Sequence, residues 1–167
     1  FLGQYDWDGV NLAELYFEAL KGLDDPQYFT PMHPSAQKEI RKRYGVDMKD
    51  IFDPVSPGYW KSNLAAKDAV VEYRVDVIER VYETLLDLCE QIAAGRQGFE
   101  IVVTAMDNLG SPELREYIAV DMHKVLGLQK KYHFVLQVED PEDQWSTDPQ
   151  RYAKIGRKYA QLVSDSG

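Results

Sequence analysis

The chain has 167 residues, a formal net charge of −9 at pH 7 and 44% hydrophobic residues. This length and composition predict one folded domain and argue against a disordered chain. The excess of 28 acidic over 19 basic residues argues against nucleic acid or an anionic membrane surface as a partner, and suits a neutral or cationic ligand. No apolar run approaches the ~20 residues of a membrane span. Cys89 is the only cysteine, so an internal disulfide is excluded.

The stretch over residues 9–17 is apolar at both odd and even positions, which favours a strand buried on both faces of a parallel sheet. Glu14 interrupts this stretch and Glu18 follows it. Burying a carboxylate costs several kcal/mol unless it is paired or lies at a wet strand end. Barrels of the α/β class place catalytic groups at the C-terminal ends of their strands. An amphipathic helix is the alternative, because Leu12 and Leu15 also fit helical spacing.

Helical signals follow this first strand. Pro34 opens a short helix that ends near Tyr44, with Gly45 as its stop. After a loop we expect one long helix from about Trp60 to Ala94, because apolar residues recur at helical spacing without an internal Pro or Gly after Lys61. At about 1.5 Å per residue this helix is ~50 Å long, so its N-terminal part should project past the sheet.

The last third of the chain repeats a strand-then-helix order. The expected elements are a strand over residues 99–106, a helix over 111–126, a strand over 132–138 and a helix from Asp148. Such repeats imply an α/β fold with a parallel sheet and right-handed crossovers. Three units fall short of the eight strands of a closed barrel and leave two open edges. We therefore expect residues 1–167 to be a single α/β domain, a partial TIM-type barrel that is a fragment of a larger (β/α)8 barrel with its remaining strands in a larger chain.

All three expected strands end in acidic or amide side chains. In parallel α/β folds these ends share one face of the sheet, which is the ligand face. Helix capping or loop solvation could explain any one of them, but their convergence favours a site. Paired carboxylates at such a mouth are the general acid and the nucleophile or base of glycoside hydrolysis. The predicted catalytic set is Glu14, Glu18, Asp107 and Glu139.

Aromatic residues in the loops that follow the strands suggest a ligand surface. Polar-tipped aromatic rings offer flat platforms that suit the C–H faces of sugars, although large rings also pack loops together. Combined with polar residues near the strand ends, the predicted substrate-binding set is Asn11, Tyr16, Tyr59, Trp60, Asn108 and Trp145. The three histidines have no metal-ligand spacing and no phosphate-binding loop is present, so we expect no metal and no cofactor.

The segment Asp8-Gly9-Val10-Asn11-Leu12-Ala13-Glu14 resembles the Asp-Gly strand of glycosyl-hydrolase-like (β/α)8 barrels. These include bacterial family-10-type glycosyl-hydrolase-like proteins and the hydrolase domains of exopolysaccharide modification and export proteins. The layout over about residues 5–110 is also similar, with a Tyr44-Gly45-x-Asp47 segment, an aromatic at Trp60 and a long helix that carries Arg74. In that group an acid near the end of the Asp-Gly strand is a catalytic candidate. The matching position here is Glu14, with Glu18 close behind.

The resemblance implies a domain that cleaves or binds a polysaccharide in the periplasm or outside the cell. In this interpretation Glu14 is the acid/base, Glu18 is an alternative acid or substrate ligand, and Glu139 or Asp107 is the partner carboxylate. We expect Glu14 to be partly buried, as a general acid requires. Two other functions stay open. One is a non-catalytic carbohydrate-binding or scaffold domain, and the other is a small α/β signalling or interaction domain.

Overall fold

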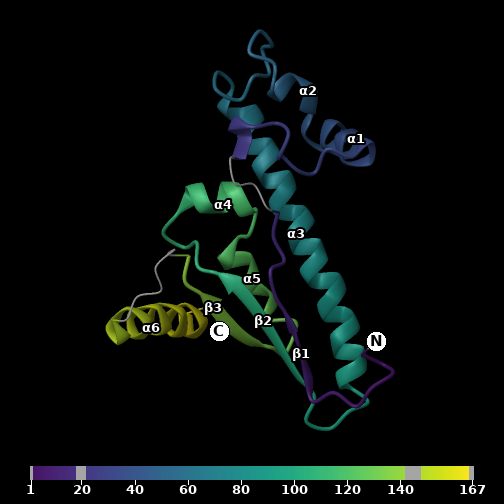
Figure 1. The fold of residues 1–167 in the computed structure, drawn as a ribbon, viewed down its shortest axis with the longest axis vertical. Helices are drawn as coiled ribbons and strands as arrows, with labels where there is room; N and C mark the ends of the chain where they lie inside the picture. Colours follow the sequence, from purple (N-terminus) through teal and green to yellow (C-terminus); the bar gives the residue numbers. More distant parts are fainter. Residues whose placement is uncertain (1, 18–21, 142–147, 166–167) are drawn as a thin grey trace.

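The computed structural model describes residues 2–17, 22–141 and 148–165 (Figure 1). Three parallel strands form one sheet in the order β1-β2-β3, with β1 at Gly9–Leu12, β2 at Glu100–Met106 and β3 at Val135–Glu139. The α/β class and the parallel sheet are therefore confirmed. Among the described residues the sheet has only these three strands and does not close into a barrel.

The two faces of the sheet differ in polarity because side chains alternate along each strand. Ile101, Val103 and Ala105 of β2 are buried on the face that carries the helices. The register places Leu12 and Leu136 on either side of Val103, so that face is apolar across all three strands. The opposite face is more polar. Its side chains near the carboxyl ends of the strands are Asn11, Thr104, Gln137 and Glu139.

The first strand is shorter than predicted. It begins at Gly9, where a Cβ atom would collide with the carbonyl oxygen of Glu100 in the neighbouring strand. It ends at Leu12 instead of continuing to Phe17, because Glu14 adopts a left-handed backbone conformation with φ of 57°. Beyond this turn the chain leaves the sheet, and the amide of Phe17 donates to the carbonyl of Ile118 over 3.0 Å.

A single long helix, α3, organises the molecule. It spans Leu64–Ala93, and Asn63 caps it by accepting a hydrogen bond from the amide of Ala66. Its continuity and its projection past the sheet confirm the prediction (Figure 1). Helices α1, at Pro34–Tyr44, and α2, at Met48–Ile51, lie beside its N-terminal part, together with a short 3₁₀ helix, η1, at Gly22–Asp24. The bounds of α1 are those predicted, whereas α2 lies in a segment expected to be a loop.

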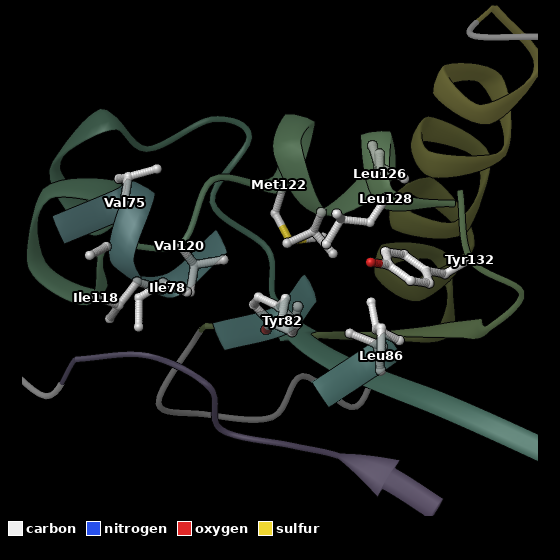
Figure 2. Packing of buried hydrophobic residues seen from close by; sticks show 14 of the residues in the cluster. Val75, Ile78, Tyr82, Leu86, Ile118, Val120, Met122, Leu126, Leu128 and Tyr132 are labelled. Atoms are coloured by element: carbon white, nitrogen blue, oxygen red, sulfur yellow. The ribbon is translucent and has the colours of Figure 1, made fainter. Parts of the chain in front are cut away.

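Two clusters of buried apolar side chains share α3. The larger cluster joins its C-terminal half to the sheet and to the segment that follows β2. Figure 2 shows Ile78, Tyr82 and Leu86 of α3 within this cluster, near Met122 and Tyr132. The smaller cluster joins the N-terminal half of α3 to α1, α2 and the loop before α1. Its most buried members are Val70, Ile40, Ile51, Met48 and Tyr73.

The helix expected over residues 111–126 is instead two helices. Helix α4 covers Pro112–Ile118 and α5 covers Met122–Leu128. Ala119 takes a left-handed conformation with φ of 58° and its amide donates to Arg115, which ends α4. Asp121 then caps α5 by accepting from the amides of His123 and Lys124. Helix α6 covers Pro149–Asp165. Among the described helices, none has the length and apolar character needed to cross a membrane.

Arg74 of α3 links the loop before α1 to the end of α4. Its side chain is buried and donates to the carbonyl oxygens of Thr30 at 2.8 Å, Glu116 at 2.5 Å and Tyr117 at 2.9 Å. Its guanidinium also stacks on the ring of Phe29, 4.7 Å from the centroid. Burial lowers the pKa of Arg74 to about 10, so the group stays charged at neutral pH. One cation therefore holds α3, the end of α4 and the loop before α1 together.

Candidate functional site

A pocket of about 430 Å³ lies at the carboxyl ends of the three strands. Each strand or the turn directly after it supplies part of the wall, and α6 supplies the rest. The lining residues are Asn11, Ala13, Glu14, Thr104, Gln137, Val138, Glu139, Asp140 and Tyr152. Of the predicted site residues, the structure therefore brings Asn11, Glu14 and Glu139 together.

Thr104 and Asn11 form a polar part of this pocket between β1 and β2. The Thr104 side chain is nearly buried, and its hydroxyl donates to the amide oxygen of Asn11 over 2.9 Å. The hydrogen bond orients the Asn11 amide with its oxygen toward the sheet, which leaves its NH₂ group as a donor for a ligand. Gln137 of β3 lies opposite Thr104 in the register and adds a second amide. These groups suit the hydroxyls of a polar, uncharged ligand.

Glu14 reaches the pocket because of its backbone conformation. In an extended strand it would share the helix-covered face with Leu12. The left-handed turn at Glu14 breaks that alternation, and the amide of Tyr16 donates to the Glu14 carbonyl over 2.9 Å. The Glu14 side chain is exposed. The expectation that Glu14 is partly buried within a strand is therefore wrong, because the strand ends two residues before it.

Two carboxylates in the pocket have no partner within the part of the chain that the structure describes, whereas a third does. Among the described residues, no hydrogen bond or ion pair engages the side chain of Glu14 or of Glu139. Glu139 ends β3 and is half-buried. The Asp140 carboxylate next to it accepts from Nε of Arg151 at 2.5 Å and from Nη2 at 2.6 Å. Glu14 and Glu139 are therefore the carboxylates that remain for a ligand.

Asp107 and Asn108 have structural contacts outside this pocket. Asp107 accepts a hydrogen bond from the hydroxyl of Tyr159 over 2.7 Å and pairs with Lys158 at 3.3 Å, so it faces α6. The buried Asn108 side chain donates to the carbonyl of Val120, and its oxygen accepts from the amide of Met122 over 3.3 Å. Asn108 thus satisfies backbone groups at the break between α4 and α5.

Of the predicted aromatic platforms, Tyr59 and Trp60 are not in the pocket wall. Tyr59 and Trp60 lie just before α3, with ring centroids 6.2 Å apart, and the Trp60 ring is flanked by the ammonium of Lys61 at 4.9 Å. Trp60 packs against the smaller cluster. Tyr16 is half-buried against the larger cluster. Glu18 and Trp145 lie outside the described residues.

Six of the nine wall residues were not predicted, among them Thr104, Gln137 and Tyr152. Thr104 lies inside an apolar run and Gln137 inside a strand, but both share strand alternation with polar pocket residues, and this parity is the signal that could have identified them. Tyr152 belongs to the final helix, from which no site residue was predicted. A helix that follows a parallel strand starts near the carboxyl end of that strand. The position of Tyr152 near the start of α6 was therefore the available signal.

Comparisons of the chain with models of known protein families, with curated proteins and with solved structures found no match. Within the described ranges, no group of three or more His, Cys, Asp or Glu side chains is placed to hold a metal ion. The side chains of the pocket are therefore the basis for its proposed function.

Proposed function

We propose that the pocket at the carboxyl ends of β1–β3 binds a segment of a polysaccharide and that Glu14 and Glu139 act on its glycosidic bond. The observation that carries this proposal is that two carboxylates without partners among the described residues line one pocket with the amides of Asn11 and Gln137. Amides and carboxylates bind sugar hydroxyls, and a carboxylate pair is the catalytic machinery of most glycoside hydrolases. The net charge of −9 also suits a neutral sugar chain better than an anionic one.

In this proposal the two carboxylates have different roles. Glu14 donates a proton to the glycosidic oxygen as the acid, and Glu139 serves as the partner carboxylate that acts as nucleophile or base. A carboxylate at Glu139 also stabilises the positive charge that develops on the sugar ring as the bond breaks. The Asp140 carboxylate is held by both nitrogens of the Arg151 fork and so takes no part in proton transfer.

The finer architecture that we propose is a section of a (β/α)8 barrel. The sequential order β1-β2-β3, with the main crossover helices over one apolar face, supports this architecture. A doubly wound sheet reverses its strand order and has helices on both faces. Asn11, Thr104 and Gln137 would then face the barrel interior, and further strands would pair with the open edges of β1 and β3.

A non-catalytic carbohydrate-binding domain is the second candidate. The exposure of Glu14 favours it, because burial is the usual means by which a protein keeps a general acid protonated near neutral pH. Such a domain would use the same amides and carboxylates only as hydrogen-bonding groups. The two functions therefore predict the same ligand but a different response to removal of the acid.

Hydrolysis of a panel of β-linked gluco- and aminogluco-oligosaccharides tests the proposal. Glu14→Gln keeps the shape of the side chain but removes the acid, so turnover should fall about a hundredfold or more while binding is largely kept. Glu139→Gln should have a comparable effect. Glu100→Gln is the matched control, because Glu100 is exposed at the opposite end of β2. Binding without turnover in the wild type would favour the second candidate, and wild-type turnover in Glu14→Gln would refute the assigned acid.

A further inference from the structure

Tyr152 is the only aromatic residue in the wall of the pocket among the described residues. It lies near the start of α6, one helical turn before Ile155, and a second turn leads to Tyr159. Ile155 and Tyr159 pack against the larger apolar cluster, whereas 44% of the Tyr152 side chain is exposed. The same helical face therefore anchors α6 on the core and presents a ring at the pocket.

The residue next to Tyr152 attaches this part of α6 to the end of β3. Arg151 binds the Asp140 carboxylate through Nε at 2.5 Å and Nη2 at 2.6 Å. Asp140 has 6% of its side chain exposed and Arg151 has 32%, so this two-point ion pair is partly shielded from water and should be stronger than a fully exposed pair. The planar fork fixes orientation as well as distance.

We propose that Tyr152 is the sugar-stacking residue of the pocket and that the Arg151–Asp140 pair is the positioning element that holds its ring there. This proposal rests on the proposed function and names its ligand more closely. A tyrosine ring presents a flat apolar surface with a polar tip, which matches a pyranose that has C–H bonds on one face and hydroxyls around its edge. The carboxylates and amides on the strands would bind those hydroxyls. Tyr152 thus selects for pyranoses with an apolar face.

The role of Tyr152 is tested by titrating the wild type and its variants with the same oligosaccharide panel. Tyr152→Phe keeps the ring and should retain affinity within about threefold. Tyr152→Leu removes the aromatic face and should weaken binding about tenfold, which corresponds to the upper range for an aromatic contact. Tyr28→Leu is the matched control, because Tyr28 is similarly exposed but lies outside this pocket.

A double-mutant cycle shows whether Arg151 affects sugar binding by positioning Tyr152 or only by stabilising the protein. Introduced into the wild type, Arg151→Met should weaken sugar binding several-fold. Introduced into Tyr152→Leu, the same change should leave the affinity unchanged. Arg151→Lys, which keeps the charge but lacks the fork, should lie between wild type and Arg151→Met. Additive effects of the two changes would overturn the positioning role, and wild-type affinity in Tyr152→Leu would overturn the stacking role. If either of these results is found while the wild type binds sugar and Glu14→Gln loses turnover, only the role of Tyr152 and Arg151 is refuted and the proposed function stands. If the wild type binds no sugar, this inference and the proposed function both fail.

Discussion

The hydroxyl of Tyr159 donates a hydrogen bond to Oδ1 of Asp107 over 2.7 Å, which ties α6 to the end of β2. Tyr159 is buried, and the Asp107 side chain is only 13% exposed. A carboxylate that looks catalytic in the sequence is thereby engaged in holding a helix against the sheet. The contact also supports the position of Tyr152 at the pocket, because both tyrosines belong to α6.

Tyr159→Phe should lower the free energy of unfolding by about 1.5–3 kcal/mol, since it removes a hydrogen bond to a largely buried carboxylate, which keeps its contacts with Lys158 and the amide of Leu109. Urea denaturation measures this value. Tyr152→Phe is the matched control, and it should leave stability within about 0.5 kcal/mol because its ring is partly exposed. Equal stability of Tyr159→Phe and wild type would mean that the contact with Asp107 does not hold α6.

The same contact predicts an alkaline response. Burial, together with the hydrogen bond to Asp107, raises the pKa of Tyr159 far above its ordinary value. A tyrosine ionises near pH 10 in the unfolded chain. The stabilisation from neutral Tyr159 is therefore complete below that pH and is lost as the pH rises above it. Tyr159→Phe should make the decline of unfolding free energy above pH 10 shallower than in wild type, and an unchanged slope would contradict the assignment.

At acid pH the cap of α5 should weaken. Burial acts to raise the pKa of Asp121, but hydrogen bonds from Arg115 and from two backbone amides hold this pKa below its usual value. The resulting stabilisation is present above about pH 4, where an unfolded Asp is ionised, and is lost as the pH falls through the lowered pKa. Asp121→Asn should flatten the fall in unfolding free energy below pH 4. Asp68→Asn, at an exposed position of α3, should leave the slope unchanged.

Replacing Glu14 with glycine should stabilise the protein, because Glu14 adopts a left-handed backbone conformation. A residue with a Cβ atom pays about 1–2 kcal/mol in this conformation, whereas glycine does not. Glu14→Gly should therefore raise the free energy of unfolding by about 1 kcal/mol while it abolishes turnover. Glu14→Gln keeps the strained backbone and should unfold like the wild type. If Glu14→Gly is less stable than Glu14→Gln, the turn after β1 is not formed as described.

Two leucines on α3 provide a test of the core. Leu86 is fully buried in the larger cluster and Leu88 is 52% exposed. Leu86→Ala should cost about 2–5 kcal/mol of unfolding free energy. Leu88→Ala, the same chemical change two residues later, should cost less than about 1 kcal/mol. Similar losses at both positions would show that another surface covers Leu88.

Some sequence signals were sufficient to predict where a helix begins and ends, and others were not. Pro34 and Gly45 fixed both ends of α1, because one has a φ suited to a first helical turn and the other adopts a left-handed stop with φ of 69°. The break between α4 and α5 was missed because Ala119, with no intrinsic preference for a left-handed conformation, adopts one. Asn108, eleven residues earlier in the chain, satisfies the neighbouring backbone groups. The conformational preferences of neighbouring residues carry no information about such a tertiary contact.

The candidate site was predictable only in part, for similar reasons. Strand ends identified Glu139 and Asn11 because parallel strands bring their carboxyl ends together. Spacing alone could not show that Asp107 turns toward Tyr159, since its partner lies 52 residues away. Nor could spacing show that Trp60 packs with α1 and α2 on the projecting part of α3. Glu14 reaches the pocket only through a backbone conformation that its residue type does not favour.

An NMR titration of the side-chain amide groups with a β-linked oligosaccharide shows directly whether this pocket binds sugar. Asn11 and Gln137 are the only amide side chains in the wall of the pocket among the described residues. Their NH₂ resonances should shift progressively and saturate, while those of the exposed Gln91 and Gln97, at the far end of α3 and beyond it, stay unchanged. Saturating shifts confined to Asn11 and Gln137 would support a sugar site at the carboxyl ends of the strands. No shift at either residue, or equal shifts at all four, would contradict it.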